Sequence, residues 1–152
     1  MINKFQKFIP QLFRDLTSLG SLVFFAWILL FVLAMKEFSL FLQLVFGTVF
    51  TLIMVVFIRM VYFKNRPNKQ NHSNFIERMD ASSFPSLHSA RIVFLAITLA
   101  SFFKTEYVTI FFTIFAVLVM YSRYYLRKHD LWDILGGILL GLLTFWLTTF
   151  FF

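Results

Sequence analysis

The sequence lacks cysteine and is poor in charge, and each shortage excludes a class of protein. Without cysteine the chain has neither a disulfide framework nor a thiolate zinc site. Charged residues make up only 14% of the chain, against roughly 25% in soluble domains, which excludes an ordinary water-soluble enzyme and a charge-rich disordered chain. Only 7 residues are acidic against 14 basic ones, so the few charges are mostly positive.

Apolar residues fill the chain instead. Of its 152 residues 60% are hydrophobic and 24 are phenylalanine, more apolar surface than a soluble domain of this size could bury. A membrane-spanning helix needs about 20 residues and satisfies its own backbone hydrogen bonds in lipid. The sequence therefore predicts an all-α integral membrane bundle with five transmembrane helices, as one domain over residues 1–152. The expected spans are residues 16–35, 38–58, 86–103, 107–122 and 134–152.

The N-terminal segment, residues 1–17, mixes basic residues with phenylalanine and leucine. This pattern is typical of an amphipathic helix that lies at the membrane interface. A frayed terminus is the alternative, and the sequence leaves both open.

Alternating the spans across the bilayer places two polar segments, residues 64–84 and 122–133, on one face. Of the 14 basic residues 12 lie on this face, all except Lys36 and Lys104. Such residues suit lipid headgroups or an anionic substrate, and Lys64 is interpreted as part of a basic rim facing the headgroups. Because the basic residues do not form a stripe with exposed aromatics, nucleic acid is not an expected partner.

Three short segments on this face carry chemistry. Arginine presents a charged fork of donors suited to phosphate, and the first N–H groups of a helix point at an anion. His129 and Asp133 are four residues apart, so on a helix a carboxylate could hold one imidazole nitrogen and leave the other to attack phosphorus. His88 could protonate the leaving oxygen and then activate water. The segments are Arg59 to Arg66-Pro67, Pro85-Ser86-Leu87-His88, and Ser122-Arg123 to His129 and Asp133.

This arrangement resembles the type 2 phosphatidic acid phosphatase superfamily, whose signature is Lys-x6-Arg-Pro, Pro-Ser-x-His and Ser-Arg-x5-His-x3-Asp. One position departs from it, because Arg59 stands where the family has lysine. The resemblance implies that His129 forms a phosphohistidine, that Asp133 orients it and that His88 is the acid and base. It also implies a site without metal or cofactor, in which phosphate is bound by Arg59, Arg66, Ser86, Leu87 and Arg123.

The expected function is hydrolysis of a phosphomonoester or diphosphate on a membrane lipid. Candidate substrates implied by the resemblance are phosphatidic acid, phosphatidylglycerol phosphate and isoprenyl diphosphates. A non-catalytic lipid-phosphate binder or transporter is the alternative, although binding alone would not need both histidines and Asp133. A purely structural membrane subunit would not explain the spacing of the polar residues.

Other features of the sequence leave their alternatives open. The positive-inside rule places the basic face in the cytoplasm, whereas the resemblance, which we follow, places it on the extracytoplasmic side of the cell membrane. Gly137 and Gly141 form a small-residue patch for close helix packing or for a homo-oligomer. Arg91 either touches substrate or supports the site.

Overall fold

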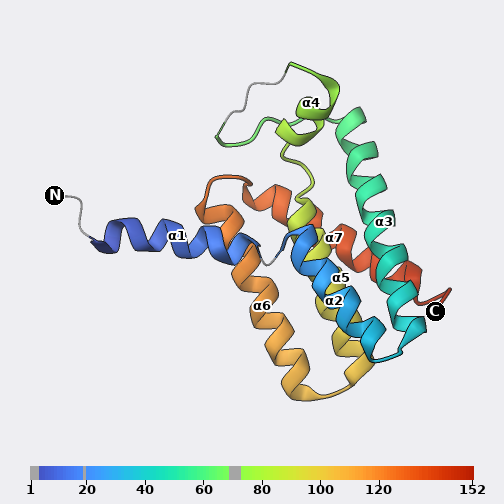
Figure 1. Cartoon of the computed structure of the whole chain (residues 1–152). Helices are drawn as coiled ribbons and strands as arrows, with labels where there is room; N and C mark the ends of the chain where they lie inside the picture. The colour runs from blue at the N-terminus through green and yellow to red at the C-terminus, as the bar shows by residue number, and fades with distance from the viewer. Residues whose placement is uncertain (1–3, 19, 69–72) are drawn as a thin grey trace.

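The computed structural model describes residues 4–18, 20–68 and 73–152 (Figure 1), and its regular elements there are all helices. The all-α prediction is confirmed for these residues. The helices are α1 (Lys4–Ser18), α2 (Leu22–Ala34), α3 (Phe38–Val61), α4 (Phe75–Ala81), α5 (Leu87–Phe103), α6 (Glu106–Tyr125) and α7 (Leu131–Thr148).

Three described helices, α3, α6 and α7, are long and apolar enough to cross a membrane. A fourth candidate is the pair Pro10–Ser18 and Leu22–Ala34, which is bent by 43°. Helix α2 has only 13 residues because it begins after Ser21, whose hydroxyl caps it by accepting the Phe24 N–H at 3.3 Å. Helix α5 is apolar and has 17 residues. The chain is thus a helical membrane bundle, but the count of five spans is not confirmed.

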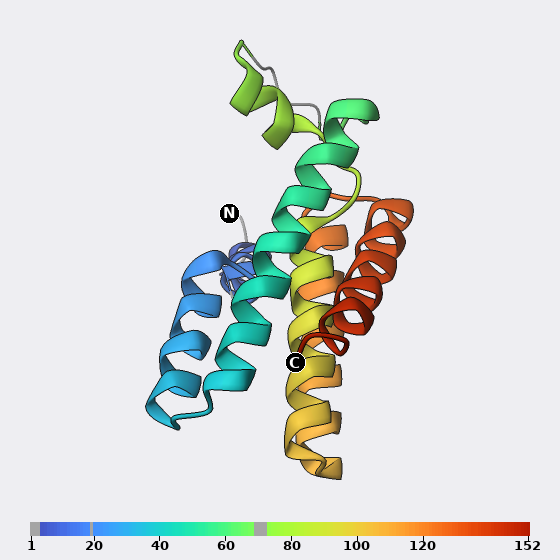
Figure 2. The ribbon, with the colours of Figure 1, turned by 90° about the vertical axis from the view of Figure 1, so that its right-hand side faces the viewer.

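Helix α5 lies at the centre of the bundle, packed against α3, α6 and α7 (Figure 2). Most of its residues are buried, and the Phe94 ring is fully buried in the core. Gly47 on α3 makes room for this ring, because a Cβ there would lie 2.1 Å from Phe94 Cζ. Many of the chain's other large apolar side chains, among them Trp27, Leu139 and Trp146, are exposed and suit lipid.

Helices α5 and α7 approach each other closely at two glycines. A Cβ on Gly137 would lie 2.6 Å from the Ser86 carbonyl oxygen, and one on Gly141 would lie 2.6 Å from the Ala90 carbonyl oxygen. The small-residue patch therefore serves close packing within the chain, as small residues do between membrane helices. Oligomerisation stays a prediction.

The two ends of the bundle differ. At one end short turns join α2 to α3 and α5 to α6 (Figure 1). At the other end the expected polar segment 64–84 includes α4, which Asn74 caps by accepting the Glu77 N–H at 2.9 Å; its residues 69–72 lie outside the described part. The Asn-x-x-Glu spacing is a helix-start signal that the sequence analysis missed.

Helix α1 projects to one side of the bundle (Figure 1) and packs against α6. The Phe13 ring contacts Tyr125 with ring centroids 4.1 Å apart and Tyr121 at 5.6 Å. A helix over Lys4–Ser18 agrees with the helical reading of residues 1–17, of which residues 1–3 lie outside the described part. Its place at the membrane interface stays a prediction.

Candidate active site

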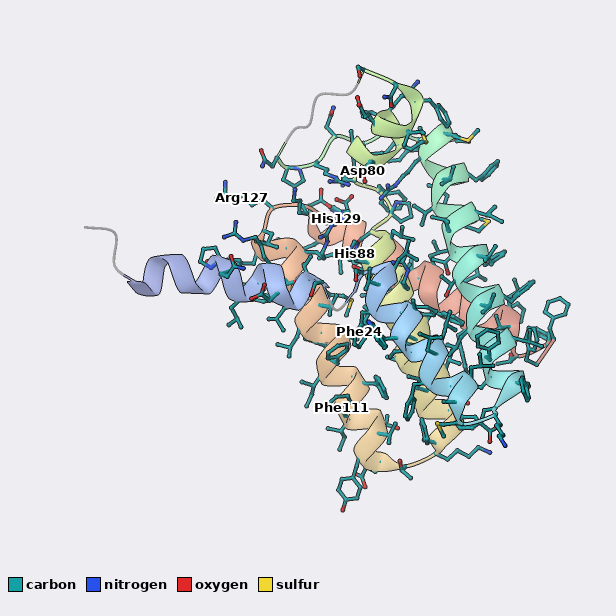
Figure 3. The ribbon with its side chains drawn as sticks, in the orientation of Figure 1. Phe24, Asp80, His88, Phe111, Arg127 and His129 are labelled. Carbon is teal, nitrogen blue, oxygen red and sulfur yellow. The ribbon has the colours of Figure 1, made fainter. Side chains whose placement is uncertain are left out.

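The three sequence motifs meet at the end of the bundle that carries α4, where Figure 3 labels His88, His129 and Asp80. Arg59 lies in the last turn of α3, His88 in the first turn of α5 and Arg123 in the last turn of α6. The start of α5 is tied to α7, because the Ser86 N–H donates to the Asp133 carbonyl at 2.9 Å. Segments distant in sequence therefore form one polar cluster at the helix ends.

His129 lies between a carboxylate and a guanidinium. Its Nδ1 is 3.6 Å from Asp133 Oδ2, just beyond hydrogen-bond distance, and its Nε2 is 3.4 Å from Nη2 of Arg123. Because guanidinium only donates, Nε2 must accept, so the proton of the neutral ring lies on Nδ1 toward Asp133. Burial, aided by the charge of Arg123 and opposed by Asp133, lowers the pKa of His129. The ring is thus oriented with the lone pair of Nε2 toward Arg123.

Four groups surround the buried Asp133 carboxylate. Oδ1 accepts from Lys64 Nζ at 2.9 Å and from the Ser83 hydroxyl at 3.3 Å. Oδ2 accepts from the Asp130 N–H at 3.0 Å and faces His129. Asp130 in turn caps α7, since its carboxylate accepts the Asp133 N–H at 3.0 Å. Asp133 therefore stabilises the start of α7 and also faces the His129 ring.

Lys64, which the sequence predicted to face the lipid headgroups, belongs to this cluster instead. Its ammonium lies 2.6 Å from Asp130 Oδ2 as well as 2.9 Å from Asp133 Oδ1. Burial lowers the pKa of Lys64, but the hydrogen bonds to both carboxylates outweigh it and raise the pKa overall. The lysine is held there because the loop ends pair, with the Ser83 N–H donating to the Lys64 carbonyl at 2.8 Å.

The three predicted arginines are all buried, with different partners. Arg66 donates to the Asp80 carbonyl and lies 3.4 Å from its Oδ1. Arg59 spans two carbonyls, Met79 at 2.8 Å and Pro85 at 3.1 Å, and so holds the segment that leads into α5. The Nε of Arg123 has no hydrogen-bond partner among the described residues.

The start of α5 has the features predicted for an anion site. Ser86 is the N-cap, and its hydroxyl oxygen accepts from the Ser89 hydroxyl at 2.9 Å and the Ser89 N–H at 3.4 Å. Leu87 and His88 follow in the first turn, where backbone N–H groups lack partners within the helix. The half-buried His88 interacts electrostatically with Arg123 and His129. The structure therefore brings all eight sequence-predicted site residues to one end of the bundle.

A cavity of about 530 Å³ adjoins the cluster on the side of α6. Its size is in the range of small-molecule sites, and its wall combines aromatic rings with charged groups. No group of three or more histidine, aspartate or glutamate side chains in the described residues is placed to hold a metal ion. The cavity is lined by Pro67, Tyr121, Tyr124, Tyr125, Arg127, His129 and Asp130.

Two solved structures have the same fold. The first is a transmembrane PAP2 type phosphatidylglycerolphosphate phosphatase from Bacillus subtilis, with TM-score 0.76 and 25% identity over 95% of this chain and 76% of that one. The second is LpxE of Aquifex aeolicus, with TM-score 0.79 and 20% identity over 93% of this chain and 86% of that one. No curated protein sequence matches the chain.

The family model of the PAP2 superfamily matches residues 40–152, which include all three motifs and the helices that carry them. The resemblance read from the motifs is thereby confirmed. The match and the membrane phosphatase fold support a phosphoric ester hydrolase of the membrane. The chain belongs to the PAP2 superfamily.

Proposed function

We propose that the chain is a metal-independent lipid phosphate phosphatase that works through a phosphohistidine on His129. The observation that carries this proposal is the placement of the buried His129 ring, with Nδ1 facing Asp133 at 3.6 Å and Nε2 facing Arg123 at 3.4 Å. A nucleophile oriented by a carboxylate and directed at a phosphate-binding cation is the arrangement that phosphoryl transfer needs.

The reaction has two steps. In the first, Nε2 of His129 attacks phosphorus, the bond from phosphorus to the lipid oxygen breaks, and His88 gives that oxygen a proton. In the second, water attacks the phosphohistidine, His88 takes the proton of the water, and the phosphorus–nitrogen bond breaks to release phosphate. Asp133 stabilises the positive charge that develops on the His129 ring.

The phosphate oxygens fit the remaining polar groups. Arg66 and Arg123 supply charged forks, and the N–H groups of Leu87 and His88 at the start of α5 supply backbone donors. Ser86 fixes that helix start through its cap. Arg59 acts through the Met79 and Pro85 carbonyls, which place the same segment. These donors compensate the spreading negative charge of the transfer step without a metal ion.

The substrate is a phosphomonoester or diphosphate whose lipid tail stays in the bilayer. The exposed apolar faces of the bundle and the cavity beside His129 support this class. The B. subtilis protein is a phosphatidylglycerolphosphate phosphatase, which also favours a lipid monoester. In this proposal α2 and α5 complete a five-span bundle, each crossing with help from polar residues at its ends.

We place the site on the extracytoplasmic side of the cell membrane. The absence of cysteine makes this simple to test, since a single cysteine can be introduced at either end of the bundle. Arg127→Cys should react with a membrane-impermeant maleimide added to intact cells, and Lys104→Cys should react only after the cells are opened. The reverse pattern would place the site in the cytoplasm.

The decisive experiment is His129→Ala with purified protein. Labelled lipid phosphate should give an acid-labile phosphoenzyme in the parent and none in the variant, and turnover should be abolished. Binding of a non-hydrolysable lipid phosphonate should persist, which shows that the variant is folded. Near-normal turnover by the variant would exclude the phosphohistidine. A parent that binds lipid phosphate but releases no phosphate would be the non-catalytic alternative.

A further inference from the structure

The short connection between α1 and α2 contacts α5, which carries His88, and α6, which carries Arg123. We call the described residues Thr17, Ser18 and Gly20 the α1–α2 joint. The joint lies before residue 40, where the match to the family model begins. We propose that the joint positions the His88 imidazole. In this arrangement Gly20 packs against the ring, and Arg91 holds Gly20 in place through a hydrogen bond to its carbonyl. The inference rests on the proposed function.

Gly20 packs directly on the His88 side chain. A Cβ at Gly20 would lie 3.0 Å from Cδ2 of His88 and 2.9 Å from Cγ1 of Val119. Both distances are tighter than ordinary Cβ contacts, so a side chain at residue 20 would have to displace one of these neighbours. One edge of the imidazole therefore rests against the backbone of the joint.

Arg91 fixes the joint from the same helix that carries His88. Its Nη1 donates to the Gly20 carbonyl at 3.3 Å, and the residue is only 3% exposed. Residues three apart on a helix lie on one face, so His88 and Arg91 both face the joint. Of the two interpretations of Arg91, this contact favours support of the site over contact with substrate. A buried guanidinium is expensive to leave without partners, so the Gly20 carbonyl is a strong anchor point.

A second anchor joins the connection to α6. The Thr17 and Ser122 hydroxyl oxygens are 2.7 Å apart, and the Ser122 hydroxyl already donates to the Val119 carbonyl at 2.7 Å. Thr17 is therefore the donor. Ser122 directly precedes Arg123, so the joint is fixed to α5 beside His88 and to α6 beside Arg123. A shift of the joint would change the surface against which the His88 ring rests.

Leaving-group dependence isolates this effect. A misplaced general acid slows departure of an alkoxide, which needs a proton, but not of nitrophenolate, which leaves without one. General acid catalysis by a well-placed side chain raises the rate by about 10²–10⁴-fold. Gly20→Ala should therefore lower the first-turnover cleavage of phosphatidic acid about tenfold and change the first-turnover burst from p-nitrophenyl phosphate less than about twofold. His88→Ala is the reference variant. It gives the largest ratio, between the loss on phosphatidic acid and the loss on p-nitrophenyl phosphate, that removal of the acid can produce.

The matched control is Ser21→Ala. It removes the α2 cap at Phe24, 3.3 Å from the Ser21 hydroxyl, and it leaves Gly20 in place. We expect this variant to change both substrates equally or not at all. Thr17→Val, which removes the hydrogen bond to Ser122, should show the selectivity of Gly20→Ala at about threefold, and it decides the question if Gly20→Ala does not fold.

The outcomes separate the two proposals. If the parent does not cleave phosphatidic acid, the lipid arm uses phosphatidylglycerol phosphate or an isoprenyl diphosphate instead. If the parent cleaves none of these lipids and no p-nitrophenyl phosphate, the proposed function fails and this inference fails with it. If the parent cleaves both the lipid and p-nitrophenyl phosphate and the deciding joint variant loses them equally, or loses neither, the joint has a structural role only and the inference is overturned. Selective loss of lipid cleavage supports it.

Discussion

Lys64 donates to Oδ1 of Asp133 at 2.9 Å, and this leaves the other carboxylate oxygen, Oδ2, for the His129 ring. The two basic side chains thus face different oxygens of one carboxylate. The lysine, which follows α3, neutralises much of the charge that the histidine would otherwise meet. Lys64 therefore contacts His129, the proposed nucleophile, only through Asp133.

Lys64→Met should move the acidic limb of the kcat/KM profile to higher pH by about 0.5–1 unit. The charges facing His129 come from Asp133, Arg123 and Arg66. Without the ammonium the Asp133 charge acts on the ring unshielded, stabilises imidazolium and raises the pKa of His129. The neutral nucleophile is then lost at a higher pH as the pH falls. Lys128→Met, which removes another lysine of the same face, is the control, and an unshifted limb in Lys64→Met would contradict the role of Lys64.

Asp133→Asn should lower kcat by about 10²–10⁴ with little change in the dissociation constant of a lipid phosphonate. An amide can turn its NH2 group to the ring and favour the wrong tautomer. The NH2 group then takes the place of the oxygen that accepts from the Asp130 N–H, but the backbone N–H of residue 133 still donates to Asp130, so half of the cap of α7 survives. Measuring kcat and phosphonate binding separately distinguishes the two effects. A variant that keeps its rate and loses binding would make Asp133 a structural anchor only.

Arg59→Lys should lower kcat/KM about tenfold and also lower the thermal stability. Lysine lacks the fork that reaches Met79 and Pro85 together, and one lost charge-assisted hydrogen bond is worth roughly 1.5 kcal/mol. The measurements are kcat/KM and thermal unfolding in detergent. If stability is unchanged and only phosphonate binding weakens, Arg59 grips the phosphate directly instead of placing the segment before α5.

Gly137→Ala should destabilise the bundle by about 1–3 kcal/mol, the usual result of overpacking. The new methyl group would meet the Ser86 carbonyl 2.6 Å away, so activity should fall together with the unfolding temperature. Leu139→Ala on the exposed face of α7 is the control and should change neither. Wild-type stability of Gly137→Ala would show that α7 can move away from α5 without harm.

Local spacing predicted much of the site. The Pro85-Ser86 step predicts the cap of α5, because a cap depends only on geometry within a few residues. The expectation that His129 and Asp133 share one face of a helix was wrong, because α7 begins at Leu131 and His129 precedes its N-cap, although Nδ1 of His129 and Oδ2 of Asp133 still lie 3.6 Å apart. The order of the motifs and the alternation of the helices were enough to bring distant segments to one end of the bundle.

Contacts between distant segments were not predictable in this way. Lys64 is one of several lysines near a membrane face, and its pairing with Asp133 depends on the loop ends at Ser83 coming together. The fork of Arg59 could equally have pointed at phosphate, because sequence does not reveal which carbonyls a buried guanidinium meets. The split of residues 16–35 depends on the single cap at Ser21.

The turns at the end of the bundle opposite the site have a consequence for how the protein is held in the bilayer. Lys36 and Lys104 both have left-handed backbone, with φ of 62° and 52°, which costs a non-glycine residue roughly 1–2 kcal/mol. Glycine would relax both turns, but it would remove the exposed ammonium groups that can grip anionic headgroups of the second leaflet. Contacts of these two lysines with headgroups would hold the bundle at a fixed depth along the membrane normal. Without them, only the basic residues at the site end of the bundle would set that depth.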